Sequence, residues 1–254
     1  MNSFTILGSS SGVPQASRNS SGYVLKIDGS LNLIDCGGGT TTSFLRRGFN
    51  PLEIKNIFIT HTHPDHVCEL PLLIQMIYVN GFEKKLSVYV PEEFVEPLKI
   101  YLRSVYLLEE KFPFNFELIG YTNGFKYENE FTLEAIGNTH LNHYKEWIEK
   151  YSMPNKMQSH SFKIQIGETR IFHSGDLGSF DDIKDHLDGN KYVITELTHI
   201  NLNEFFEFIP SVNIGEFIVT HLSHPDDVKS LQEEIKKSGI DNITIALDGM
   251  ELQL

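Results

Sequence analysis

The sequence predicts a mixed α/β fold built on two sheets, and three observations support this prediction. Short apolar runs alternate with longer amphipathic stretches, and Gly and Pro residues separate them throughout the chain. The 254 residues are enough to bury a large core, and no linker, low-complexity tract or charge block divides them. The segment ITHTHPD at 59–65 is echoed by VTHLSHPD at 219–226, which indicates either two related halves or a chance match. We therefore expect one domain over residues 1–254.

The N-terminal half is expected to form strands that end in polar loops. A strand at 3–7 leads into the loop GSSSGVPQASRNSSG, and Asp28-Gly29 is a preferred pair for the tight turn of a hairpin. A helix expected at 65–80 should be bent by Pro71 and stopped by Gly81. The expected elements are strands at 3–7, 23–27, 31–34, 56–60 and 86–90, and helices at 40–48, 65–80 and 92–109.

The C-terminal half continues the alternation of strands and helices. Gly167-Glu168 predicts a second hairpin, and Pro154 interrupts a helical segment at 141–158 that resembles an insertion. The expected elements are strands at 131–136, 161–166, 169–172, 192–195, 217–220 and 243–247, and helices at 201–209 and 225–238.

Composition and charge exclude several classes of function. Lys and Arg total 21 against 34 Asp and Glu, which gives a formal charge of −13 and disfavours charge-driven binding to nucleic acid or anionic membranes. Two cysteines are too few for a disulfide framework, and the chain shows neither a signal peptide nor a run of eighteen apolar residues. We expect a cytoplasmic protein without membrane association.

The hexad HTHPDH at 61–66 places four potential metal ligands within six residues. Side chains at i and i+2 of an extended chain point the same way, so His61 and His63 can hold one ion. Pro64 favours a turn into a helix, whose first turn would direct Asp65 and His66 toward a second ion. Imidazole and carboxylate are ligands of zinc and similar divalent metals. The alternative is a polar loop with chance histidines.

The pattern H-x-H-x-D-H resembles the signature of the metallo-β-lactamase-fold hydrolases, and the resemblance covers nearly the whole chain. It implies a four-layer αββα sandwich that binds two divalent ions, with Zn expected first and Mn or Fe as alternatives. Asp35 in LIDCGGG matches an Asp of that family that orients ligand histidines. The resemblance implies that one ion is bound by His61, His63 and His140, the other by Asp65, His66 and His221, and that Asp176 bridges both.

Three of these assignments have alternatives. His143 could replace His140, and His224 could replace His221, because each lies three residues further along the chain. Asp176 lies between Gly and Leu after an expected strand, a setting also typical of a turn Asp.

Within that fold family, ILGSSSGVPQASRNSSGYVL, LIDCGGGT and ALDGMELQL resemble the ribonuclease Z and phosphodiesterase branch. The Ser/Gly-rich loop is either a rim for a phosphate or a flexible connector. The branch carries a His-Glu-Ala-Thr motif, whereas this chain has TELTH at 195–199, so Glu196 is retained. His199 is either an active-site group or a residue with a capping or structural role before the next helix. The branch's long basic arm is missing from the sequence, so extended RNA binding is not expected.

These observations predict a dinuclear metal-dependent hydrolase that attacks a small anionic phosphodiester with a metal-bridging hydroxide. Asp65 is a candidate proton acceptor, with His199 and Glu196 as further catalytic candidates. The insertion at 141–158 is expected to act as a lid, whose stripe of Tyr144, Trp147 and Tyr151 either stacks on a flat substrate or packs on the body. The alternatives are a lactone, thioester or other carboxylic ester hydrolase and a non-catalytic nucleic-acid-binding relative. A homodimer, as in many relatives, is left open.

Overall fold

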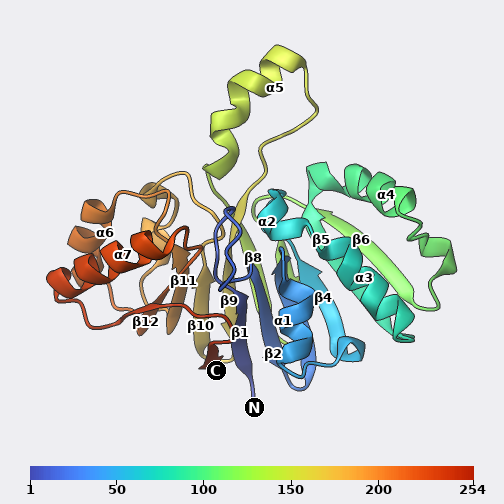
Figure 1. Cartoon of the computed structure of the whole chain (residues 1–254), viewed down its shortest axis with the longest axis horizontal. Coiled ribbons are helices and arrows are strands. Elements are labelled where there is room, and N and C mark those ends of the chain that lie inside the picture. The colour runs from blue at the N-terminus through green and yellow to red at the C-terminus, as the bar shows by residue number, and fades with distance from the viewer. The chain divides into compact units, whose positions relative to one another are not determined.

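The computed structural model describes the backbone of residues 1–254 and every side chain except that of Asp227. The chain forms two compact units, one of residues Met1–Thr122 with Leu247–Leu254 and the other of residues Asn123–Ala246 (Figure 1). Each unit contains one mixed sheet of seven strands. The single domain expected over 1–254 stays a prediction.

The sheet of the first unit has the strand order β14-β1-β2-β3-β4-β5-β6. Its pairs are antiparallel from β14 to β3 and parallel from β3 to β6. The turn at Asp28-Gly29 joins β2 to β3 as the sequence predicts. The strands are β1 Ser3–Gly8, β2 Gly22–Ile27, β3 Ser30–Cys36, β4 Ile54–Phe58, β5 Lys85–Pro91, β6 Asn115–Tyr121 and β14 Glu251–Gln253.

Helices cover one face of this sheet. Phe44 of α1, Leu73 of α3 and Leu98 of α4 pack in one apolar cluster with Leu33 of β3 and Val88 of β5. This burial removes apolar surface from water and fixes the C-terminal end of β4, which the hexad at 61–66 follows. The helices are α1 Thr40–Arg46, α2 Pro64–Val67, α3 Leu70–Val79 and α4 Val95–Ser104.

The predicted helix at 65–80 is divided into α2 and α3. Pro71 lies in the first turn of α3, where its missing N–H is tolerated, so it starts a helix rather than bending one. The helix predicted at 92–109 is also shorter than expected, because α4 ends at Ser104.

The sheet of the second unit has the order β13-β12-β11-β10-β9-β8-β7. Phe205 of α6 and Leu231 of α7 pack against Phe172, Val193 and Val219 on one of its faces. A further helix, α5, lies in an excursion between β8 and β9 (Figure 1). The elements are β7 Lys126–Glu128, β8 Thr132–Gly137, α5 Lys145–Tyr151, β9 His160–Ile166, β10 Thr169–His173, β11 Tyr192–Glu196, α6 Leu202–Phe208, β12 Glu216–Thr220, α7 Pro225–Ser238 and β13 Ile243–Ile245.

The two sheets share one pattern of strand pairing. In each, three antiparallel pairs are followed by three parallel pairs, so that β4 is the topological equivalent of β11 and β5 of β12. The sequence echo at 219–226 therefore follows β12, whereas its counterpart at 59–65 follows β4. The two similar sequence segments therefore follow strands that are not topologically equivalent. The similarity between the two halves lies in the order and direction of their strands and not in these segments.

None of the helices that the structure describes is long and apolar enough to cross a membrane.

Candidate metal centre

The histidine hexad lies where β4 ends and α2 begins. His63 is the extended residue before the first helical position, and Pro64 occupies that position. The ring centroid of His61 lies 4.8 Å from that of His63 and 4.1 Å from that of His66. The distance from His66 Nε2 to Asp65 Oδ2 is 3.5 Å. Ligand atoms of one zinc ion are separated by roughly 3.3–3.6 Å in tetrahedral geometry, so the Asp65–His66 pair has the spacing of two ligands of one ion.

Asp35 fixes the orientation of two histidines of this loop. Its carboxylate is fully buried, accepts the Thr60 N–H at 2.8 Å and lies 2.7 Å from His66 Nδ1. The Thr60 hydroxyl donates to the same carboxylate and lies 3.1 Å from His61 Nδ1. A neutral imidazole that donates through Nδ1 carries its lone pair on Nε2, the form that binds a metal. The orienting contact expected of Asp35 is therefore present.

The backbone of the DCGGGT segment at 35–40 packs directly on the first turn of α2. A Cβ atom at Gly37 would lie 1.8 Å from the carbonyl oxygen of Asp65, so only glycine fits there. Glu69 follows the hexad, and its carboxylate accepts the N–H groups of Gly39 and Thr41 at 2.7 and 2.8 Å. These contacts hold the loop after β3 and the start of α2 in one position.

The Ser/Gly-rich loop is anchored by a residue from the far end of the chain. Asp248 accepts the N–H groups of Ser9 and Asn19 at 3.0 and 2.6 Å. Gly12 of this loop would place a Cβ atom 3.5 Å from the Asp65 carboxylate. These contacts place the loop beside Asp65 and favour a rim of the site over a flexible connector. Sequence reasoning did not single out Asp248, although it lies within the recognised ALDGMELQL ending.

Three further ligand candidates meet within the second unit. His140 follows β8, Asp176 follows β10 and His221 follows β12, and all three are buried. The Oδ2 atom of Asp176 lies 3.6 Å from His140 Nε2 and 3.1 Å from His221 Nε2. One carboxylate oxygen therefore lies at about the spacing of ligands of a metal ion from two imidazole nitrogens. His140 Nδ1 lies 3.3 Å from the Leu177 carbonyl oxygen, and burial lowers the pKa of His140, which favours the neutral ring.

The local competitors of these ligands lie in different surroundings. His143 is exposed, and its Nδ1 lies 2.8 Å from the backbone carbonyl oxygen of His140. His224 is also exposed, at the start of α7. His221 has a φ of 57°, and Asp35 has a φ of 58°, a left-handed conformation that is costly for residues other than glycine. The geometry favours His140 and His221 as ligands.

Glu196 and His199 form a pair beside these ligands. Glu196 is fully buried and accepts the N–H groups of Leu177 and His199 at 3.0 Å each, while its Oε1 lies 2.9 Å from His199 Nδ1. This hydrogen bond raises the pKa of His199, whereas burial opposes the increase. The ring centroid of His199 lies 5.1 Å from that of His140 and 5.7 Å from that of His221.

The capping alternative for His199 is wrong, because the side chain of Asn201 caps α6. A sequence signal for the position of His199 exists: Leu197-Thr198-His199 follows β11 as Ile59-Thr60-His61 follows β4, its topological equivalent. Donor atoms of Glu196, His199 and His221 also lie within 4.8 Å of one another. Since the Glu196 carboxylate already accepts several hydrogen bonds, it acts here as the group that positions His199.

The insertion after His140 carries exposed aromatic rings. Tyr144, Trp147 and Tyr151 are 40, 54 and 60% exposed, so the alternative that this stripe packs on the body is wrong. The rings of Trp147 and Tyr151 are stacked at a centroid distance of 6.0 Å, and Lys150 Nζ lies 5.2 Å from each centroid. The His143 and Tyr144 rings are 4.0 Å apart, which extends the aromatic surface back toward His140.

Each unit thus presents imidazole and carboxylate groups that fit a divalent ion. The imidazoles of His61, His66 and His140 each use Nδ1 for a hydroxyl, carboxylate or carbonyl oxygen, an arrangement common around ligand histidines. The candidate ligands are mostly buried, and ionic or polar groups in such sites need a charge partner. The donor set is the one that zinc, manganese or iron accepts.

Comparisons with known proteins agree with this description. The model of the family of anti-Pycsar protein Apyc1 matches residues 2–201. A ribonuclease Z from Picrophilus torridus is 32% identical over 137 residues, which are 54% of this chain and 43% of that relative, so the match spans less than half of its length.

Two solved structures share the fold over nearly their full length. The metallo-β-lactamase fold protein YhfI from Bacillus subtilis superimposes with a TM-score of 0.77 at 19% identity and covers all of both chains. The short form of human tRNase Z has a TM-score of 0.72 at 20% identity and covers 99% of this chain and 98% of its own. The metallo-β-lactamase fold, an α/β sandwich, predicted from the sequence is thereby confirmed.

Proposed function

We propose that this chain, which belongs to the family of anti-Pycsar protein Apyc1, is a metal-dependent hydrolase that cleaves a small phosphodiester. The observation that carries the proposal is the position of Asp176, whose Oδ2 lies beside the Nε2 atoms of both His140 and His221. A carboxylate oxygen beside two imidazoles is able to act as the shared ligand of two adjacent ions, and paired ions occur in phosphatases and nucleases.

The proposed ligands are those implied by the family pattern. His61, His63 and His140 would hold one ion, Asp65, His66 and His221 the other, and Asp176 would bridge them. Zinc is our first choice, because imidazole and carboxylate are its usual ligands with cysteine, and manganese or iron would accept the same donors. Such ions, when bound, would lower the pKa of a water and neutralise charge that develops on the substrate.

The remaining residues would hold and move protons. Asp65 lies at the start of α2 and would accept the proton of the attacking water. His199, held by Glu196 through Nδ1, would direct its other ring nitrogen to the leaving oxygen and donate a proton there. The loop at 9–21 would present backbone N–H groups and serine hydroxyls to phosphate oxygens.

The charge balance supports a small anionic substrate. Two divalent ions with two ligand carboxylates would leave a local charge of about +2, although the chain carries −13 overall. A cyclic nucleotide or a nucleotide-derived ester fits this charge. Extended RNA binding is not part of the proposal, because Lys145, Lys150 and Lys156 of the insertion are nearly balanced by Glu146 and Glu149. We propose that the insertion covers the substrate as a lid.

We also propose a cytoplasmic location. Both cysteines are free thiols, as expected in a reducing compartment.

The test compares two substrate classes. The purified chain is reconstituted with zinc or manganese and assayed on a chromogenic phosphodiester and on a lactone, beside a His63→Ala control. We expect metal-dependent hydrolysis of the phosphodiester and its loss in the control. Hydrolysis of the lactone alone would assign the chain to the carboxylic ester hydrolases. Turnover of neither substrate by metal-loaded protein would favour a non-catalytic relative.

A further inference from the structure

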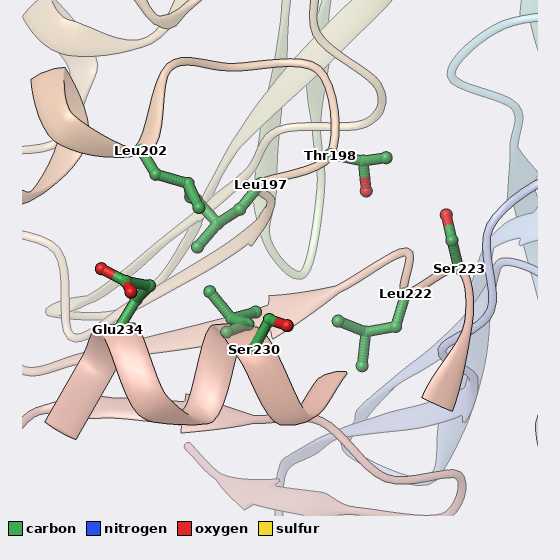
Figure 2. A pocket seen from close by; sticks show the side chains of 8 residues that line it. Leu197, Thr198, Leu202, Leu222, Ser223, Ser230 and Glu234 are labelled. Atoms are coloured by element: carbon green, nitrogen blue, oxygen red, sulfur yellow. The ribbon is translucent and has the colours of Figure 1, made fainter. Parts of the chain in front are cut away.

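The second unit has pockets of two kinds. A pocket of about 410 Å³ between the segment after β11 and helix α7 has walls formed mainly by leucine side chains (Figure 2). Its charged lining residue, Glu234, already accepts a hydrogen bond from Lys237 Nζ at 2.8 Å. Another pocket, the polar pocket, has a volume of about 300 Å³ and is lined mainly by charged and polar side chains, which include Lys163, Arg170, Asp185, Asp188 and Asn190.

The polar pocket lies toward the ends of β10 and β11 that are away from the candidate metal centre. Arg170 is the second residue of β10, whereas Asp176 follows the end of that strand. The turn that carries Asp185 and Asn190 precedes β11, whereas Glu196 is the last residue of β11. A ligand in the polar pocket would therefore bind apart from the substrate.

Charged side chains around this pocket do not pair with one another. Among the side chains that the structure describes, Lys163, Arg170 and Asp185 form no ion pair. Lys163 lies opposite Glu134 in the pairing of β8 with β9, yet the Glu134 carboxylate lies 3.9 Å from Lys126 Nζ. Charges of both signs thus border one pocket, and a ligand that carries both signs would pair with them.

The guanidinium group of Arg170 is held against the backbone of the turn before β11. A Cβ atom at Gly189 would lie 2.1 Å from Arg170 Nη2, so the guanidinium rests where only glycine fits. The Gly189 N–H donates to the Asn213 carbonyl oxygen at 2.7 Å, and the Asp188 carboxylate accepts the Asn213 N–H at 2.8 Å. A guanidinium placed in this way is pre-organised to bind a carboxylate through two parallel hydrogen bonds.

Asn190 and His186 contribute uncharged groups to the lining. The Asn190 amide donates through Nδ2 to the carbonyl oxygens of His186 and Leu187 at 2.9 and 2.6 Å, which leaves Oδ1 as an acceptor. Burial and the positive charge of Lys163 lower the pKa of His186 and favour the neutral ring, although the Asp185 carboxylate opposes this shift. The pocket therefore offers two cations as donors and an amide oxygen and a carboxylate as acceptors.

We propose that the polar pocket binds a free α-amino acid as its zwitterion. The α-carboxylate would pair with Arg170 and Lys163, and the α-ammonium group would pair with the Asp185 carboxylate and Asn190 Oδ1. Arg170 and Asn190 also line a neighbouring pocket of about 270 Å³, which leaves room for the side chain of the ligand. An anion without an ammonium group would be repelled by Asp185, and a cation without a carboxylate would be repelled by Arg170 and Lys163. The inference goes beyond the proposed function and does not depend on it.

The test measures binding and requires no activity. Glycine, L-alanine, L-serine, L-aspartate and L-lysine are titrated separately into the full chain by calorimetry. Each titration uses metal-loaded and metal-free protein, because an amino acid can also coordinate a metal ion. The analogues of the bound amino acid that lack either the ammonium group or the carboxylate are titrated next; for L-alanine these are propionate and ethylamine.

Two variants remove one charge each from the pocket. Arg170→Gln removes the cation that rests on Gly189, and Asp185→Asn removes the carboxylate proposed for the ammonium group. Both positions are exposed, so we expect both variants to fold, which chemical denaturation checks. Arg46→Gln is the matched control, because Arg46 is exposed at the end of α1 and does not line the pocket.

We expect at least one amino acid to bind with a Kd below about 1 mM in both metal forms. Arg170→Gln should weaken this binding by about tenfold or more and Asp185→Asn by several-fold, because each leaves one end of the zwitterion without its charged partner. Both analogues should bind the wild-type protein about tenfold more weakly than the amino acid does. Arg46→Gln should leave the affinity unchanged.

Three results would overturn the proposal. The first is wild-type protein that binds none of the five amino acids in this range. The second is binding that disappears with the metal and is unchanged in Arg170→Gln, which would assign the amino acid to coordination at the metal centre. The third is equal affinity for the amino acid and for its analogue without the ammonium group, which would make the pocket a simple anion site. The expected binding in a protein that hydrolyses no phosphodiester would support the pocket and overturn the proposed activity alone.

Discussion

Replacing Asp35 by Asn should weaken metal binding by about 10- to 100-fold, because it reverses the tautomer of His66. The Thr60 N–H is a donor and must still meet the amide oxygen, so the new NH2 group faces His66 Nδ1. Nδ1 must then accept a hydrogen bond, and the ring proton moves to Nε2, the proposed ligand atom. Loss of such an orienting partner typically costs 10- to 100-fold in metal affinity, or about 1.4–2.7 kcal/mol.

The same substitution has a small effect on the backbone. Asn tolerates the φ of 58° at position 35 better than other side chains do, so the left-handed conformation is kept. Replacing a buried charge-assisted hydrogen bond by a neutral one should lower the free energy of unfolding by about 1–2 kcal/mol.

The assay is competition between the protein and a chromophoric zinc chelator, with metal-free folding followed by chemical denaturation. Asp28→Asn is the matched control, because Asp28 also has a positive φ but lies exposed in the β2–β3 turn. Wild-type metal affinity in Asp35→Asn would refute the role assigned to the Asp35–His66 contact.

Three further predictions concern the backbone, the proton donor and the insertion. Gly37→Ala should lower the free energy of unfolding by about 1–3 kcal/mol, because its Cβ would meet the Asp65 carbonyl oxygen. The control Gly38→Ala, whose nearest contact would be at 3.5 Å, should lower it by less than about 1 kcal/mol. Equal denaturation curves for the two variants would contradict this prediction. His199→Ala should retain the metal content and lower kcat by about 10²–10⁴-fold, and loss of bound metal instead would make His199 a ligand. Trp147→Ala should change the free energy of unfolding by less than about 0.5 kcal/mol and raise KM several-fold, because the ring is half exposed on the proposed lid; an unchanged KM would remove it from substrate binding.

Local sequence signals predicted the parts of the centre that are local in the chain. The hexad, the strand before it and the Asp35 motif lie within about thirty residues, and strand periodicity with Pro64 places their side chains. The division of the helix at 65–80 was missed, because Pro71 fits the first turn of a helix as well as a bend.

Long-range contacts could not be derived in this way. The contact of Asp248 with Ser9 joins positions 239 apart in sequence and depends on the pairing of β14 with β1. The strand β14 is too short to show a hydrophobic pattern in the sequence. The role of His199 depends on the equivalence of β11 and β4, which follows from strand order and direction. A three-residue match carries too little information to reveal that equivalence from the sequence.

The dinuclear centre is tested most directly by the metal content of the purified chain after reconstitution with zinc or manganese. Elemental analysis by mass spectrometry, combined with protein quantification, gives the number of ions per chain. We predict close to two ions per chain in the wild type and fewer in His63→Ala. Less than one ion per wild-type chain would contradict the dinuclear centre.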